Sequence, residues 1–183
     1  MAINYRNFRK VSALILFTAF LVSGYVFAQE TAEGVFNKGL GIFRLGYDDE
    51  AILSFTRAIE LDPKYDMAYY FRGLAYDHKG NQGQAISDYT KAIELNPKNG
   101  LAYSNRGLAY GIRGNYKKAI LDFTRIIELD PDSAQTYIYR GEAYSAINNY
   151  NKAWADMHKA EELGAEVHPR ILEDLKKASG REK

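Results

Sequence analysis

Apolar residues recur three and four positions apart along most of this chain, in short segments closed by Gly, Asn or Pro. YFRGLAYDHKG (70–80) and QAISDYTKAIEL (84–95) are two such segments, and each places its apolar side chains on one side of a helix. Gly and Asn accept the backbone conformation that stops a helix, and Pro cannot continue one. The pattern predicts an all-α chain of short helices in which neighbours pack antiparallel.

The helical segments repeat with a period of 34 residues. Pro63, Pro97 and Pro131 lie 34 residues apart, and they close the nearly identical stretches AIELDP, AIELNP and IIELDP. A fixed period of this length indicates one supersecondary unit that is stacked on itself. With each proline as the thirty-second residue of a unit, four units follow one another: 32–65, 66–99, 100–133 and 134–167.

Two sets of positions recur with this period. The first closes the first helix of each unit, where we expect a left-handed backbone conformation: Gly46, Gly80, Gly114 and Asn148. The second lies inside that helix, with an alanine twelve residues later: Gly39, Gly73, Gly107 and Gly141. Because a glycine inside a helix costs about 1 kcal/mol relative to alanine, we expect these small residues to meet where the two helices of a unit cross.

The period and the recurring order of Gly, Tyr, Ala, aromatic, Ala and Pro resemble the tetratricopeptide repeat family over residues 32–167. The resemblance implies a right-handed α-solenoid of four helix-turn-helix repeats. It also implies that first helices line a concave face and second helices a convex one. Residues 168–180, HPRILEDLKKASG, resemble the capping helix of that family, with Ile171, Leu172, Leu175 and Ala178 on one face.

The sharpest departure from the family pattern is the residue before the recurrent glycine, which is usually Leu in the family and here is Lys38, Arg72, Arg106 or Arg140. Sixteen residues later come Ser54, Asp88, Asp122 and Asp156. The unit without Arg is also the unit without Asp. We therefore predict that each Arg pairs with the Asp of its own unit. The alternative is that the three arginines form a ladder for an acidic ligand.

The inferred concave positions are more apolar than the convex ones, and an exposed apolar patch usually marks a partner site. We therefore predict that a protein or peptide, either helical or extended, binds there. Only Asn37 and Asn105 match the Lys and Asn clamp with which family members hold terminal carboxylates, so we expect no such clamp. The main predicted contacts are Phe43, Tyr70, Phe71 and Tyr139, and the others are Phe36, Met67, His78, Leu101, Asn105, Ile112 and Ile138.

Residues 1–28 are of a different kind, with Arg6, Arg9 and Lys10 followed by an apolar stretch and Val26-Phe27-Ala28. This order is typical of a secretory signal, and we predict cleavage after Ala28. The alternative is an uncut membrane anchor, since the apolar stretch is close to the length that spans a bilayer. Both alternatives place the repeats outside the cytoplasm, in a periplasm or cell envelope.

Composition and charge argue against several classes of function. Removal of the predicted signal leaves 21 basic and 23 acidic residues, interspersed along the helices, so we expect no nucleic acid partner. The chain has no Cys and three scattered His, and it lacks the common catalytic motifs, so we expect no enzymatic activity, cofactor or metal. Two alternatives to an adaptor stay open: a homo-oligomeric scaffold, and a small-ligand site around Asp77 and His78.

Overall fold

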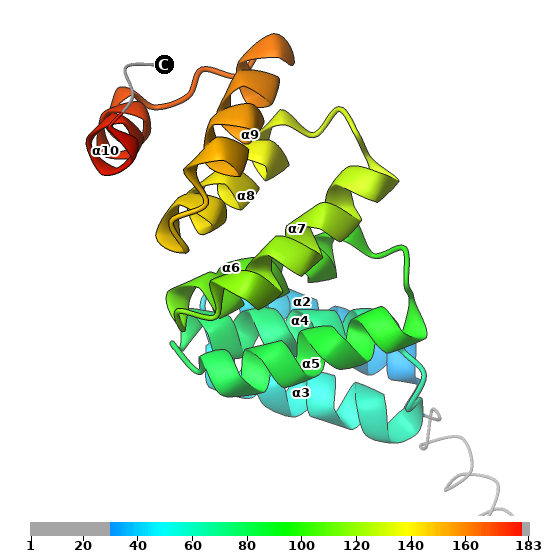
Figure 1. Ribbon diagram of the computed structural model, residues 1–183. Helices are drawn as coiled ribbons and strands as arrows, with labels where there is room; N and C mark the ends of the chain where they lie inside the picture. Colours follow the sequence, from blue (N-terminus) through cyan, green and yellow to red (C-terminus); the bar gives the residue numbers. More distant parts are fainter. Residues whose placement is uncertain (1–29, 181–183) are drawn as a thin grey trace, which may run out of the picture.

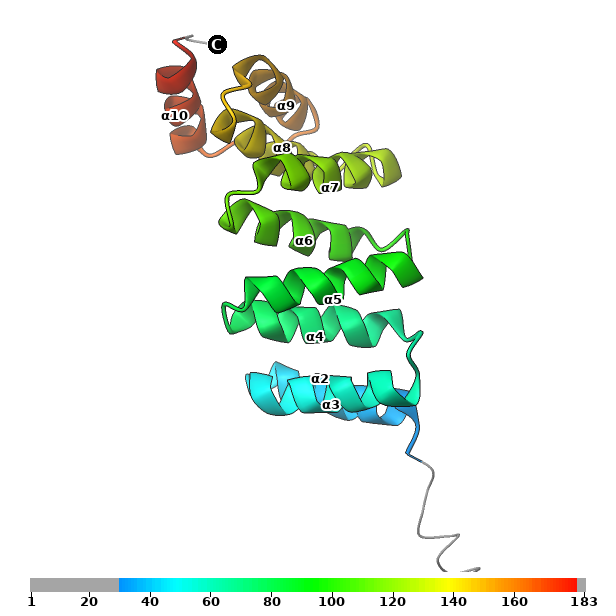
Figure 2. The same cartoon turned by 60° about the horizontal axis from the view of Figure 1, so that its bottom comes forward.

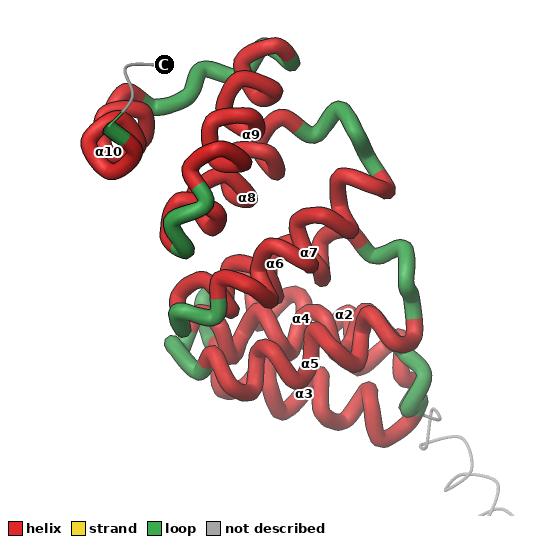
Figure 3. Tube along the Cα trace, viewed as in Figure 1, coloured by secondary structure: helices red, strands yellow, loops and turns green. Residues whose placement is uncertain are grey.

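The computed structural model describes residues 30–180, so the predicted signal segment lies outside the described residues (Figure 1). Within that range the chain forms α-helices joined by short loops, without a β-strand (Figure 3). The helices are α2 (Ala32–Arg44), α3 (Asp48–Leu61), α4 (Asp66–His78), α5 (Gln82–Leu95), α6 (Gly100–Ile112), α7 (Tyr116–Leu129), α8 (Ala134–Ala146), α9 (Tyr150–Glu162) and α10 (Pro169–Ser179). None of these helices is long and apolar enough to cross a bilayer.

The turn inside each unit is built on the predicted left-handed residue. Gly46, Gly80 and Gly114 have φ angles of 83°, 74° and 73°, and Asn148 has the same conformation with a φ of 62°. The backbone N–H of each residue donates to a carbonyl near the end of the helix before it. The first helix of each unit therefore ends where the repeat pattern predicts.

The helices stack into two layers. The two helices of a unit pack together, and each second helix also packs on the first helix of the next unit (Figure 2). The first helices α2, α4, α6 and α8 also contact one another in sequence, whereas within residues 30–180 the second helices α3, α5, α7 and α9 do not. The stack therefore curves, with first helices on the inner side and second helices on the outer side.

The recurrent glycines lie where the helices of a unit cross, as predicted. A Cβ atom on Gly73 would lie 2.8 Å from Cε1 of Tyr89, and one on Gly107 would lie 2.8 Å from Cε1 of Phe123. Gly39 and Gly141 meet Phe55 and Met157 in the same way. The four large side chains are buried and form the centre of each unit's core. Glycine is thus needed because a ring or thioether occupies the space of its missing side chain.

Helix α10 covers the open side of the fourth unit. Leu175 is buried against α8 and α9, and Ile171 and Leu172 are half-buried beside it. The indole Nε1–H of Trp154 on α9 donates to the Ser179 hydroxyl at 3.1 Å. Ala178, which we expected on the same face, is exposed. The apolar side of α9 is therefore capped at the C-terminal end of the stack.

Candidate peptide-binding surface

The inner surface is formed by α2, α4, α6 and α8, which carry all eleven predicted contacts. Of these residues, His78, Leu101 and Ile112 are exposed, and Leu101 and Ile112 keep 63% and 71% of their surface accessible. Phe43, Met67, Phe71, Asn105 and Tyr139 are half-buried. The remaining three, Phe36, Tyr70 and Ile138, are buried.

The burial of Phe36, Tyr70 and Ile138 corrects their interpretation as groove contacts. Their exposed fractions are 6%, 6% and 5%, and each occupies the fifth position of its unit. Phe36 packs against the rings of Tyr65 and Phe71, with centroids 4.9 Å and 5.5 Å away. That position points toward the next unit or, for Ile138, toward the C-terminal segment, so these side chains fill the core.

Asn105 and His78, two other predicted contacts, interact with side chains of the protein itself. The Asn105 side-chain amide on α6 donates to the Tyr70 hydroxyl on α4 at 3.0 Å, which links two inner helices. The imidazole of His78 stacks on Phe43 with centroids 4.9 Å apart, and its Nδ1 lies 3.4 Å from Oδ1 of Asp48. The N-terminal part of the inner surface is therefore held together by contacts between its own side chains.

The residues of the alternative small-ligand site are also engaged. His78 has the contacts with Phe43 and Asp48, and Oδ1 of Asp77 accepts a hydrogen bond from the Gln82 side-chain amide at 2.6 Å. No group of three or more potential ligand residues within residues 30–180 is arranged to hold a metal ion. These contacts disfavour a small-ligand site at this place.

An apolar hollow of the inner surface lies between α6 and α8 and has a volume of about 360 Å³. Its floor includes Ala119 and Phe123 of α7. Leu108 and Ile112 line it from α6, and from α8 it is lined by Tyr139, Glu142, Ala143 and Ala146. A Cβ atom on Gly111, at its edge, would meet no atom within 4 Å. We call this hollow the α6–α8 groove.

A second hollow of about 250 Å³ adjoins this groove between α8, α9 and α10. Its lining residues are Glu142, Ser145, Ala146, Met157, Ile171, Asp174 and Leu175. Glu142 and Ala146 line both hollows. The two hollows therefore form one strip along the C-terminal half of the inner surface, with Glu142 at their shared edge.

The Glu142 carboxyl was missed in the sequence. It occupies the ninth position of its unit, where the other three units have Leu40, Leu74 and Leu108. Partial desolvation raises the pKa of the Glu142 carboxyl, although the residue as a whole remains exposed. The break in the leucine series was the signal that could have revealed it.

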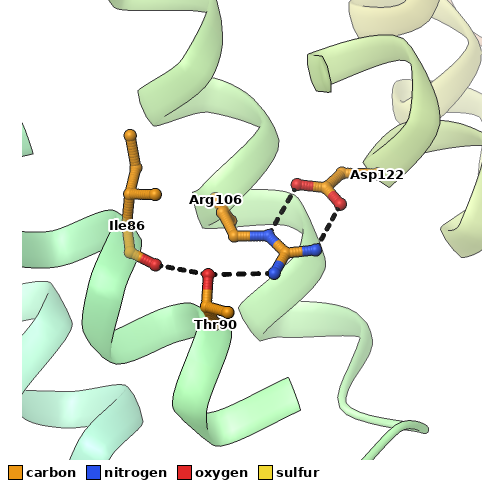
Figure 4. Close-up of polar contacts among 4 residues, drawn as sticks. All are labelled: Ile86, Thr90, Arg106 and Asp122. Atoms are coloured by element: carbon orange, nitrogen blue, oxygen red, sulfur yellow. Dashed lines mark hydrogen bonds and ion pairs between the residues drawn. The ribbon is translucent and has the colours of Figure 1, made fainter. Parts of the chain in front are cut away.

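Each Arg pairs with the Asp of its own unit, as predicted. Arg106 donates through Nε and Nη2 to the two carboxylate oxygens of Asp122, at 2.9 Å and 2.7 Å (Figure 4). Equivalent two-point contacts join Arg72 to Asp88 and Arg140 to Asp156. Burial raises the pKa of the Asp122 carboxyl, and the contact with Arg106 offsets part of this rise. We expect both groups to be ionised, since charge-assisted hydrogen bonds reach both carboxylate oxygens.

A third partner of each Arg was missed in the sequence. Nη1 of Arg106 donates at 3.0 Å to the hydroxyl of Thr90 in the preceding unit, and Thr90 itself donates to the carbonyl of Ile86 (Figure 4). Thr56 and Thr124 accept from Arg72 and Arg140 in the same way. The signal was present, because Thr recurs in units one to three and Arg in units two to four.

The arginines therefore connect units and do not form an acidic-ligand site. All three guanidinium nitrogens of Arg106 donate within the protein, and its guanidinium carbon lies 5.5 Å from the ring centroid of Tyr103. Arg72 and Arg140 have the same set of partners, including Tyr69 and Tyr137. These contacts disfavour the ladder alternative, because each guanidinium is already paired with an aspartate and all three of its nitrogens donate within the protein.

Sequence comparison identifies the family of the repeats. Family models described as tetratricopeptide repeat match residues 35–65, 67–99, 100–133 and 123–155. These matches cover most of the chain, and the helices that they span form an all-α solenoid. The chain belongs to the tetratricopeptide repeat family, and it is a protein–protein interaction module. Members of this family are generally not enzymes. No curated protein sequence matches the chain significantly.

Several solved structures are similar to this chain. A crystal structure of MamA is 25% identical, with a TM-score of 0.72, and the alignment covers 90% of this chain and 96% of that one. The first repeat domain of Spaghetti (RPAP3), bound to the HSP90 peptide SRMEEVD, is 29% identical with a TM-score of 0.62, over 64% and 94% of the two chains. MamA from Desulfovibrio magneticus RS-1 is 22% identical with a TM-score of 0.73, covering 81% and 89%, and supports the fold alone.

Proposed function

We propose that this protein is an adaptor that binds a segment of a partner protein along its inner surface, chiefly in the α6–α8 groove. The observation that carries the proposal is an apolar hollow whose edge is formed by the exposed side chain of Ile112, with half-buried Tyr139 opposite. Exposed apolar side chains around a hollow gain free energy when a partner covers them. The similarity to the RPAP3 domain, which was solved with a bound peptide, supports the same mode of use.

A site-specific photo-crosslinker tests the location of binding. We would place it at Ile112 and, as a matched control, at Leu121 on the outer helix α7, where the exposed fraction of 69% is nearly the same. In the native host we expect a discrete partner adduct from position 112 that is absent at position 121. Identical adducts from both positions would contradict the proposal, because binding would then not distinguish the inner from the outer surface.

The same experiment addresses the homo-oligomeric scaffold. Leu53 and Leu121 are exposed apolar residues on outer helices, and they favour this second function because they offer contacts to another copy. If the scaffold is correct, the adduct at position 121 has twice the mass of the chain. Light scattering of the purified protein would then show a stable dimer.

We further propose that the protein acts in a periplasm or cell envelope. The support is the basic and then apolar order of residues 1–28, which ends in Val26-Phe27-Ala28. Mass spectrometry of the protein isolated from its host should give a chain that begins at Gln29. An intact N-terminus in the membrane fraction would instead favour the anchored alternative.

A further inference from the structure

We propose that the α6–α8 groove recognises a partner segment in which a Lys or Arg lies beside an aliphatic or aromatic residue. The proposal rests on the function proposed above and adds the chemistry of the occupant. Glu142 provides the charge that selects the basic side chain, and the apolar lining of the groove provides the contacts for its neighbour.

The first argument for a basic partner is the position of Glu142 in the fold. This carboxylate lines both hollows of the inner surface, and it replaces the leucine that the other units have at the same position. No ion pair or hydrogen bond joins its side chain to another residue within the described range 30–180. A carboxylate that is partly desolvated and unpaired gains from a cationic partner.

The second argument is the charge of the residues that line the two hollows. The titratable residues that line the two hollows are Glu142, Asp174, Tyr116 and Tyr139, and no Lys or Arg lines them in the described part of the chain. Arg170 lies 3.9 Å from Asp174, but both side chains are largely exposed, and such a pair contributes little. The strip is therefore apolar with a net negative charge.

The third argument is the shape of the groove. Leu108, Ile112 and Ala146 form apolar walls on both sides, and Gly111 leaves space at the edge. A Lys or Arg can lay its methylene stem on such walls while its charged end reaches Glu142. An acidic segment would place its charges against Glu142 and Asp174, which disfavours it.

A groove-blocking variant of the full chain tests the proposal. Gly111→Gln adds a side chain at the groove edge, where a Cβ atom would meet no atom within 4 Å, so we expect the protein to fold. Gly41→Gln on α2 is the matched control, because a Cβ atom there also meets nothing and Gly41 lies outside the groove. A phage-displayed library of random heptapeptides is selected on the wild type, and the selected peptides are then tested on both variants.

Peptides that bind the wild type and Gly41→Gln but not Gly111→Gln are groove-dependent. We expect these peptides to be enriched in Lys or Arg next to an aliphatic or aromatic residue. Their affinity should fall about tenfold in Glu142→Gln and stay unchanged in Glu161→Gln, which removes an exposed carboxylate of α9.

The outcomes separate this inference from the proposed function. Groove-dependent peptides without a basic bias, or with an affinity that Glu142→Gln leaves unchanged, would overturn the inference and leave the proposed groove standing. If no selected peptide depends on Gly111, both are overturned.

Discussion

At the scale of single residues, the arginines before the recurrent glycines of units two to four each connect their unit to the one before it. Arg106 extends from α6 to Asp122 on α7 and to Thr90 on α5, so that one side chain bridges three helices. Both charges lie mostly out of solvent. Such a pair specifies geometry more than it adds stability, and loss of one partner leaves the other buried without compensation.

Arg106→Leu should therefore lower the free energy of unfolding by about 3 kcal/mol, because Asp122 is left buried and unpaired. Thr90→Val should cost less, about 1–2 kcal/mol, since it removes the two hydrogen bonds of the Thr90 hydroxyl but leaves the charged pair intact. Urea unfolding followed by circular dichroism measures both. Lys38→Leu is the control with little expected effect, because Lys38 is exposed and its unit has Ser54 in place of Asp.

A double-mutant cycle with Asp122→Leu isolates the pairing. We expect the double variant to recover part of the loss, since neither charge is then stranded. A coupling energy of zero between Arg106 and Asp122 would contradict the pairing.

Two glycines of α6 should respond in opposite directions to the same substitution. Gly107→Ala places a methyl group against the buried ring of Phe123 and should destabilise the protein by about 1–3 kcal/mol. Gly111→Ala points into open space and should stabilise it by about 1 kcal/mol through helix propensity. Thermal unfolding of the two variants compares them directly, and equal shifts of the midpoint would show that the crossing at Gly107 is not tight.

At the scale of elements, each helix of the stack depends on its neighbours to cover its apolar side. The last outer helix, α9, has no further unit beyond it, and α10 takes that place with Leu175 and the contact between Trp154 and Ser179. A stacked repeat needs such a terminal cover, since the side of α9 that α10 covers is apolar.

Leu175→Ala should cost about 2–5 kcal/mol, because Leu175 is 2% exposed and its truncation leaves a cavity beneath α10. We also expect increased binding of a hydrophobic dye, as α10 loosens from α9. Leu172→Ala on the same helix is the milder control, since Leu172 is only half-buried. Equal losses for both variants would mean that α10 is held in some other way.

At the scale of the whole molecule, stability is distributed unit by unit, because each unit contacts only its adjacent units and α10 contacts only the fourth unit. The first unit differs from the others, since Lys38 and Ser54 replace the charged pair. It keeps a cluster of phenylalanine rings, but its two helices lack the side-chain link that Arg140 and Asp156 form in the fourth unit.

We therefore expect the backbone amides of α2 and α3 to exchange with solvent faster than those of α8 and α9. The fourth unit is the comparison: it also has only one neighbouring unit, but it has both the charged pair and the cover of α10. Hydrogen exchange with mass spectrometry measures the difference. Slower exchange in α2 and α3 would show that the aromatic cluster outweighs the missing pair.

The repeat pattern by itself determined the all-α stack, the turn residues, the tight glycine crossings and the Arg–Asp pairs. These features depend on spacing within one unit, and a period of 34 residues repeats each of them in the sequence. Sequence also placed Ile112 and Tyr139 on the inner surface, where both line the α6–α8 groove.

Only the tertiary structure decided which inner residues reach solvent and which fill the core. Phe36, Tyr70 and Ile138 share a position that is covered by the next unit or, for Ile138, by the C-terminal segment, and the spacing within one unit does not reveal that cover. The contact of Arg106 with Thr90 and the place of Glu142 beside two hollows also involve helices of other parts of the stack, so the spacing within one unit does not reveal them either. The physical reason is that these contacts depend on how one unit is rotated against the next, and this rotation is set by packing between units.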